Sequence, residues 1–226
     1  MDQSALIEIL QTIPVLLFAF VAHEWGHAYA ALKQGDPTAY NAGRLTFNPI
    51  VHIDPFRTII LPAILLSMGG IAVGGAKPCP VNPANFRSYK RGDIIVSLAG
   101  VTMNLLIALA SALLFLALGL LGRAVPSTSE VLTILQQMLQ ISVTYNLLLL
   151  FLNLLPIPGF DGAHVLMHFL PSSTAIAYRR MERFSLVFLF ALISFAGGVF
   201  ALLISPASIL RDVLMHPVLS FALGIQ

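Results

Sequence analysis

Long apolar stretches separated by short polar connections run through the whole chain. About 20 apolar residues suffice for a helix to cross a bilayer, and the stretches that meet this length cover residues 5–33, 94–121, 141–170 and 184–204. A shorter stretch, residues 58–73, contains Pro62 and is marginal for a straight crossing. The pattern predicts an all-α polytopic membrane protein with about four transmembrane helices.

The stretch at 141–170 contains a break, because Pro156-Ile157-Pro158-Gly159 cannot continue a helix. We expect the helix to stop near Leu155 and to resume at Asp161. A break at membrane depth frees backbone amides and carbonyls, which is tolerated only against protein or water. The sequence therefore predicts a broken helix in a part of the protein that water can reach.

The positions of Lys and Arg predict how the chain crosses the bilayer. If residues 58–82 dip into the membrane and return, ten of the 12 basic residues fall on one side and only Arg123 and Arg211 on the other. If this region spans instead, the division is five to seven. A strong excess marks the cytoplasmic face, so we predict a re-entrant element at 58–82 and an outside amino terminus. The tail, residues 206–226, is expected at the membrane interface.

Composition supports this class of protein. Of the 226 residues, 58% are hydrophobic and 10% charged, and the mean hydropathy is +0.88, values typical of integral membrane proteins. The net charge of +2 is too small to indicate a nucleic-acid partner. A single cysteine, Cys79, excludes an intrachain disulfide. Because no polar linker is long enough to separate two domains, we expect one membrane-embedded domain, residues 1–226.

Three ionisable side chains lie together in His23-Glu24-Trp25-Gly26-His27, at the end of the first stretch. On a helix, His23 and His27 lie one turn apart on one face, where two imidazoles can bind one tetrahedral metal ion. Glu24 then flanks the open coordination position and can act as a general base. Lone histidines on helices are more often structural, but ionisable groups are expensive inside a membrane and are kept there for function. The motif therefore predicts an intramembrane metal site.

Two histidines leave the metal short of one protein ligand. The candidates are Asp161, Asp54, His52 and the pair His164 and His168. Asp161 stands out because it directly follows the predicted helix break. It could instead only cap the helix that resumes at Gly162. His164 and His168 could form a second site, although structural or interfacial roles fit them better.

With these two motifs, the chain resembles the site-2 protease family of intramembrane zinc metalloproteases. HEWGH at residues 23–27 matches the family's HExxH, and NLLPIPGFDG at 153–162 matches its second motif, which ends in Asp-Gly. Short bacterial and archaeal members are also similar to the connecting segments GDPTAYNAGRLTFNPIVHIDPFRTIILP, GGAKPCPVNPANFR and AGVTMN. Two distant motifs with their connecting segments in order make this a specific match.

The resemblance implies that His23, His27 and Asp161 bind one zinc ion per chain and that Glu24 is the general base. It also implies that the re-entrant region, 58–82, is partly extended, so that an unwound substrate can lie against it. Pairing with such an edge would offset the cost of unwinding a helix in lipid.

Three further site candidates follow less directly. Asn104 and Asn153 could donate hydrogen bonds to the developing oxyanion or orient a ligand. Helix packing accounts for Asn104 equally well, since Asn104 and Gly100 could let a neighbouring helix approach closely. His52 matches the family's HIDP stretch, and whether it contacts the metal or only organises its loop stays open.

The chain also departs from the family pattern. We expect a short member, because no membrane helix precedes the metal-binding one and there is no room for a PDZ or CBS module. Gly74-Gly75 and Cys79 stand where an aromatic and an aliphatic residue are frequent, so the substrate contact there can differ.

We therefore expect an enzyme, a zinc-dependent metalloendopeptidase that hydrolyses peptide bonds within or near transmembrane segments of other proteins in regulated intramembrane proteolysis. Its partners are transmembrane protein substrates and the lipid bilayer, with no nucleic acid, and a homo-oligomer is left open. We expect a multi-pass protein of the cell membrane. Since His27 and His23 precede Lys33 by six and ten residues, the site should lie roughly 9–15 Å inside the cytoplasmic boundary.

Two alternatives belong to other classes of protein. An intramembrane metal transporter would repeat histidine and acidic residues across several spans, whereas here they cluster mainly at two places. An inactive protease-like membrane protein would bind membrane segments without cutting them, and the intact motif argues against it.

Overall fold

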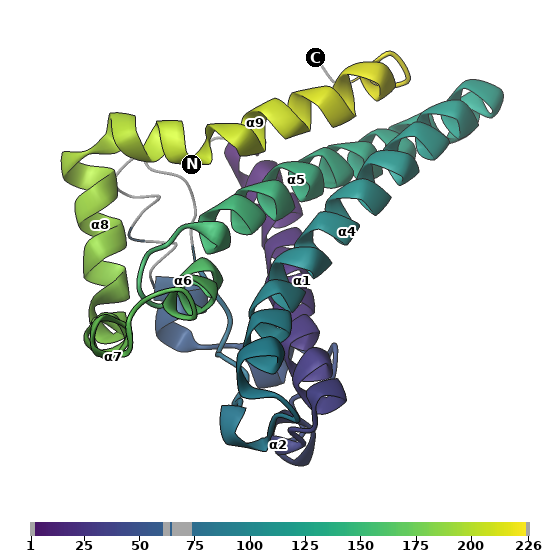
Figure 1. The fold of residues 1–226 in the computed structure, drawn as a ribbon. Coiled ribbons are helices and arrows are strands. Elements are labelled where there is room, and N and C mark those ends of the chain that lie inside the picture. The colour runs from purple at the N-terminus through teal and green to yellow at the C-terminus, as the bar shows by residue number, and fades with distance from the viewer. Residues whose placement is uncertain (1–2, 61–63, 65–73, 225–226) are drawn as a thin grey trace. The chain divides into compact units, whose positions relative to one another are not determined.

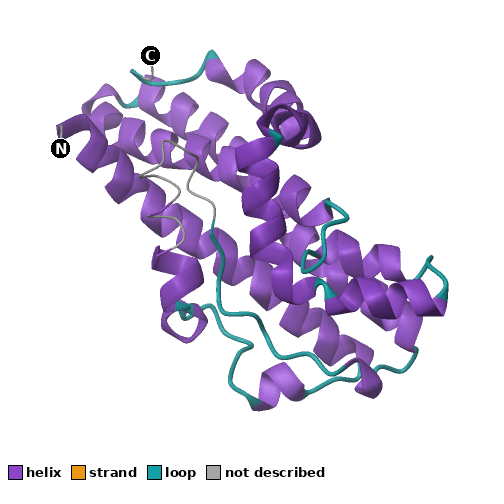
Figure 2. Ribbon diagram, turned by 90° about the vertical axis from the view of Figure 1, so that its left-hand side faces the viewer, coloured by secondary structure: helices purple, strands orange, loops and turns teal. Residues whose placement is uncertain are grey.

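A computed structural model of the protein describes residues 3–60, 64 and 74–224 (Figure 1). Every regular element among these residues is helical (Figure 2), as the apolar pattern predicts. Part of the predicted re-entrant element at 58–82, residues 61–63 and 65–73, lies outside the described residues. Its re-entry into the membrane therefore stays a prediction.

Long helices alternate with short ones along the chain. In order, the elements are α1 (Gln3–Gln34), α2 (Thr38–Asn41), η1 (Pro49–His52), η2 (Pro55–Ile60), η3 (Pro83–Asn85), α4 (Tyr89–Ala124), η4 (Pro126–Thr128), α5 (Ser129–Leu154), α6 (Asp161–Met167), α7 (Ser172–Arg180), η5 (Glu182–Phe184), α8 (Ser185–Phe195) and α9 (Gly197–Leu219). Element η2 is a π-helix, and the other η elements are 3-10 helices.

Four helical segments of the described chain are long and apolar enough to cross a membrane: Leu6–Gln34, Tyr89–Ala124, Pro126–Leu154 and Gly197–Leu219. Large apolar side chains on these helices point outward, among them Leu113 and Leu202. Such exposure is unfavourable in water and favourable in hydrocarbon. The prediction of an all-α polytopic membrane protein with about four spans is confirmed.

The predicted span at 184–204 differs from the structure. It is divided at Ala196 (φ −134°, ψ 40°) into α8, which ends at Phe195, and α9, which begins at Gly197. Two adjacent glycines, which are weak helix formers, account for the break. Helix α9 then runs on to Leu219, so most of the tail expected at the interface (206–226) belongs to an apolar helix.

Helix α5 begins at Ser129, twelve residues before the predicted stretch at 141–170. This part of the helix was not predicted because it carries polar residues, and their side chains form hydrogen bonds within the protein. Gln136 Nε2 donates to the carbonyls of Phe115 and Phe221, and Gln11 Nε2 donates to Gln137 Oε1 at 2.8 Å.

The predicted break is confirmed, since α5 ends at Leu154 and α6 begins at Asp161.

The chain forms two compact units. We call Leu17–Gly100 the histidine unit, and Met1–Leu16 together with Val101–Gln226 the aspartate unit. In the aspartate unit, α9 packs along α5 (Figure 1) over a core of Ala108, Ala112, Phe115, Val143, Leu147, Ala207, Met215 and Val218. In the histidine unit, Ala30 and Ala31 of α1 pack with Phe86 and with Val96 of α4. The expectation of one domain over residues 1–226 stays a prediction.

Buried polar pairs join α4 to α5 in the aspartate unit. Asn104 Nδ2 donates to Asn146 Oδ1 at 2.9 Å, and the hydroxyls of Ser111 and Ser142 lie 2.9 Å apart. Both asparagines are fully buried. Hydrogen bonds of this kind between membrane helices contribute about 0.6–2 kcal/mol each.

Candidate metal centre

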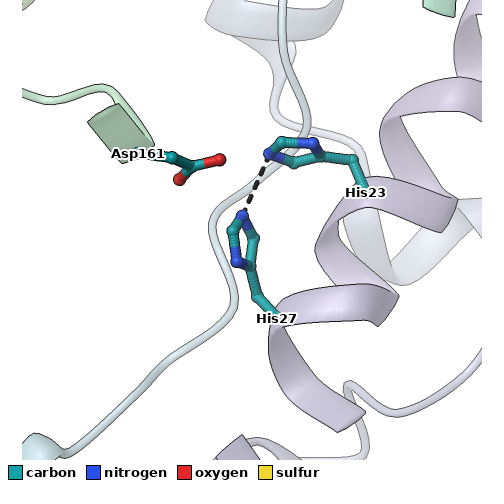
Figure 3. Close-up of side chains that lie close together, drawn as sticks. All are labelled: His23, His27 and Asp161. Atoms are coloured by element: carbon teal, nitrogen blue, oxygen red, sulfur yellow. Dashed lines mark hydrogen bonds between the residues drawn. The ribbon is translucent and has the colours of Figure 1, made fainter. Parts of the chain in front are cut away.

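The two histidines of the HEWGH motif face each other on α1. One turn of helix separates them, and their Nε2 atoms lie 3.0 Å apart (Figure 3). The rings meet edge to face with their centroids 4.6 Å apart, and His23 is 9% exposed. The sequence prediction that one helix face presents both imidazoles is confirmed.

The tautomer of His27 suits a metal ligand. Its Nδ1 lies 2.8 Å from the carbonyl oxygen of Val96 on α4. A carbonyl can only accept a hydrogen bond, so Nδ1 carries the proton and the neutral ring keeps its lone pair on Nε2. A hydrogen bond from the far ring nitrogen is the usual support of a metal-binding histidine.

Gly100 makes room for the imidazole pair. A Cβ atom at this position of α4 would lie 2.4 Å from His27 Nε2 and 2.6 Å from His23 Cε1. Contacts this short are repulsive, so any larger residue would displace both rings. The close approach predicted for Gly100 is confirmed, and the space that it leaves lies at the nitrogen atoms a metal would use.

Glu24 points toward a different part of the histidine unit. Its Oε2 accepts a hydrogen bond of 2.7 Å from the backbone amide of Cys79. The bond orients the carboxylate that the motif predicts to be a general base.

Cys79 lies in an anchored segment, residues 74–82, in which alternate residues bond to the rest of the unit. The amide of Gly75 donates to Arg57 O at 3.1 Å, and the amide of Lys77 donates to His52 O at 2.7 Å. The amide of Cys79 continues this series with its bond to Glu24. Residues two apart in an extended chain face the same side, so 75, 77 and 79 all face the unit.

His52 organises this loop. Its ring is fully buried, with Nε2 3.0 Å from the carbonyl oxygen of Thr46 and Nδ1 3.5 Å from Arg44 Nη2. Burial lowers the pKa of His52, and the charge of Arg44 lowers it further. Both ring nitrogens thus contact the loop, which leaves a metal-binding role for His52 without support.

Asp161 begins α6, directly after the break in the aspartate unit. Phe160 holds the N-cap position, so Asp161 stands in the first helical turn rather than at the cap. Gly162 allows α6 to lie close to the end of α5, since a Cβ there would be 2.2 Å from Leu154 O. The helix break thus determines the position from which the Asp161 side chain extends.

The other candidate residues have local partners. Asp54 Oδ1 accepts from the amides of Phe56 and Arg57 at 2.9 Å each, so it caps η2. Asn153 Nδ2 donates to Leu149 O at 2.9 Å, and Asn104 bonds to Asn146. His164 Nε2 lies 3.9 Å from Glu182 Oε1, and His168 ends α6 at its C-cap.

Sequence reasoning missed Arg44 and the amide of Cys79. Arg44 bonds to carbonyls 33 and 34 residues further along the chain, and no local pattern reveals partners at that distance. The contact between Cys79 and Glu24 spans 55 residues and involves a backbone amide, which every residue except proline carries.

Comparison with known proteins gives consistent relatives. A model of peptidase family M50 matches residues 119–196. The protein YwhC of Bacillus subtilis, named as a candidate zinc metalloprotease, is 35% identical over 172 residues, which are 76% of this chain and 74% of YwhC. Rip2 of Mycobacterium tuberculosis H37Rv, named in the same way, is 34% identical over 176 residues, 78% of this chain and 63% of Rip2. No solved structure matches the chain.

An all-helical membrane fold with a HEWGH helix and a broken helix before Asp161 defines a membrane-embedded zinc metalloprotease. The chain belongs to peptidase family M50, the site-2 protease family.

Proposed function

We propose that this protein cuts peptide bonds within or near the transmembrane segments of other membrane proteins. In this proposal His23, His27 and Asp161 hold one zinc ion, and Glu24 is the general base. The observation that carries this proposal is the imidazole pair on a membrane helix, with Nδ1 of His27 bonded to Val96 O and the space at both Nε2 atoms kept open by Gly100.

Asp161 is the third ligand in this proposal because of its chemistry and its burial. Two imidazoles and a carboxylate form a common ligand set of catalytic zinc sites, and they leave a fourth position open. Each of the three residues offers one ligand atom, His23 being buried and the other two half-buried. Asp54 and His52, the rival candidates, are engaged in their own loop.

Zinc bound by this set supplies a Lewis acid that polarises the scissile carbonyl and lowers the pKa of water. Glu24 takes a proton from the attacking water and passes it to the leaving amine. The amide of Cys79 holds the Glu24 carboxylate in one orientation for both transfers.

The substrate and its side of approach also belong to this proposal. The substrate is an unwound membrane segment that lies along the anchored segment. If residues 58–82 re-enter the membrane, ten basic residues fall on one side and two on the other, which supports a site nearer the cytoplasmic face.

The test combines metal content with cleavage of a single-pass model substrate by the protein purified in detergent. Wild type should hold about one zinc ion per chain. Asp161→Ala and His23→Ala should lose zinc and cleavage together, whereas Glu24→Gln should keep zinc and lose cleavage. Cleavage by a well-folded Glu24→Gln variant would refute the mechanism. Full zinc binding by Asp161→Ala would refute the ligand set.

A further inference from the structure

Arg44 is a buried cation without a carboxylate partner in the described part of the chain. It is 7% exposed and follows the turn after α2, where its amide donates to Ala39 O at 2.9 Å. Burying an unpaired charge is costly unless hydrogen bonds compensate. The hydrogen bonds of the guanidinium group must therefore offset the cost of burying its charge.

The guanidinium group of Arg44 holds the anchored segment at Lys77 and Pro78. Its Nη2 donates to the carbonyl of Lys77 and lies 3.5 Å from that of Pro78. The amide of Lys77 is fixed from the same loop by His52 O, and His52 Nδ1 faces Arg44. The amide and the carbonyl of Lys77 are thus both hydrogen-bonded to the loop that contains Arg44 and His52.

The position of Lys77 determines the position of the next inward-facing amide, that of Cys79. Pro78 and Pro80 flank Cys79, and their rings fix φ near −65°. The chain between Lys77 and Cys79 is therefore stiff, and a displacement at Lys77 passes to the amide that contacts Glu24 Oε2.

We propose that Arg44 is a positioning residue for the general base: it fixes Lys77 and Pro78 so that the amide of Cys79 orients the Glu24 carboxylate. The inference rests on the proposed function, because it assumes that Glu24 performs the proton transfer. Arg44 acts at a distance, through backbone, and contacts neither substrate nor metal.

The test variant is Arg44→Lys, which keeps the charge and loses the planar fork that reaches several acceptors. The matched control is Arg91→Lys, on an exposed side chain of α4. With the single-pass substrate, we expect kcat of Arg44→Lys to fall about tenfold, the loss typical of supporting contacts around a site, with KM and zinc content unchanged. The control should match wild type.

A second measurement does not depend on cleavage. Cys79 is the single cysteine, and its thiol lies beside both Glu24 and Arg44. Alkylation with N-ethylmaleimide therefore reports on the anchored segment alone. Release of the segment in Arg44→Lys should speed alkylation about tenfold, which corresponds to one unit of pKa.

The two measurements together decide the proposal. Faster alkylation with a lower kcat and an unchanged KM supports it. Unchanged alkylation overturns it, as does faster alkylation with normal kcat, or a loss of zinc along with activity. If Arg44→Lys does not fold, Pro78→Gly loosens the same link and should give the same pattern. If wild type cuts no substrate, the proposed function fails, while alkylation still decides whether Arg44 holds the segment.

Discussion

In the aspartate unit, Asn104 and Asn146 bond to each other between α4 and α5, whereas in the histidine unit two imidazoles of α1 bring their Nε2 atoms to 3.0 Å. Both arrangements bury polar groups in apolar helices. The asparagine pair joins a donor to an acceptor, so each side chain is a hydrogen-bond partner of the other. The histidine pair brings together two nitrogen atoms of the kind that bind metal ions, beside a glycine that keeps the space open. A matched donor and acceptor indicate a structural role for the asparagines. Two nitrogen atoms that face one open space indicate a metal-binding role for the histidines.

The largest effect is expected from Gly100→Ala, which places a methyl group 2.4 Å from His27 Nε2. Both imidazoles must move, and displacements of about 1 Å can cost 100-fold in rate. We expect zinc content to fall and cleavage to drop by about two orders of magnitude, measured on protein that still folds.

Gly198→Ala is the matched control, because a Cβ at this position of α9 meets nothing within 4 Å. It should bind zinc and cleave like wild type. Normal zinc binding by Gly100→Ala would contradict the assignment of this space to the metal.

Asp36 offers a second comparison within the histidine unit, since it is a buried carboxylate that accepts hydrogen bonds from Thr38 nearby and from Asn82 and Asn85, 46 and 49 residues further along the chain. Burial alone would raise the pKa of Asp36, but bonds from Thr38, Asn85 and Asn82 to the charged form lower it. A lowered pKa stabilises the fold above the unfolded value of 3.8, and this stability is lost as the pH falls through the folded value. Asp36→Asn should lower the free energy of unfolding at pH 7 by about 1–3 kcal/mol.

Thermal unfolding in detergent at pH 7 and near pH 3 measures this effect. The gap between wild type and Asp36→Asn should narrow at the lower pH, because Asp36 of the unfolded wild-type chain then binds a proton, which favours unfolding. A gap of equal size at both values would show that the charge of Asp36 contributes nothing.

The asparagine pair should behave as structural glue. Asn104→Leu leaves Asn146 without this partner and should lower the free energy of unfolding by about 1–2 kcal/mol. The double variant Asn104→Leu, Asn146→Leu removes both polar groups and should recover part of the loss. Zinc content and cleavage should persist in the double variant. Loss of cleavage with intact zinc and folding would instead give Asn104 the oxyanion role.

Thiol reagents at neutral pH should barely react with the folded protein. Burial and the charge of Glu24 raise the pKa of Cys79 to about 12, so the thiol stays protonated. Alkylation at pH 8 should be about 1000-fold slower than in the unfolded protein, and its rate should rise about tenfold per pH unit up to pH 10. Rapid alkylation of the folded protein at pH 8 would place Cys79 in water rather than beside Glu24.

Local patterns predicted the parts of this protein that depend on local physics. The spacing of His23 and His27 in an apolar run fixed the imidazole pair, and Pro156 to Gly159 fixed the break before Asp161. The early start of α5 was missed because the bonds that satisfy Gln136, to Phe115 and Phe221, are distant in sequence. The division at Ala196 was missed because an apolar run masked the two weak helix formers that follow it, Gly197 and Gly198.

The contacts around Glu24 could not be predicted for a different reason. Arg44, His52 and Cys79 meet through backbone carbonyls and amides, which carry no residue signature. The resemblance to a family pointed to His52, and only the structure shows that both of its ring nitrogens serve the loop.

Because of Pro78 and Pro80, the two edges of the anchored segment differ in the hydrogen-bonding groups that they offer. Residues 75, 77 and 79 direct their amides into the unit, so the opposite edge belongs to 76, 78 and 80, where the two prolines have no N–H. The Pro78 carbonyl lies 3.5 Å from Arg44 Nη2, so a peptide along this edge would meet the carbonyl of Pro80 as an acceptor and would have to supply the donor itself. Replacing the matching amide of a peptide inhibitor by an ester should weaken its binding, and this backbone chemistry could serve selective inhibitor design.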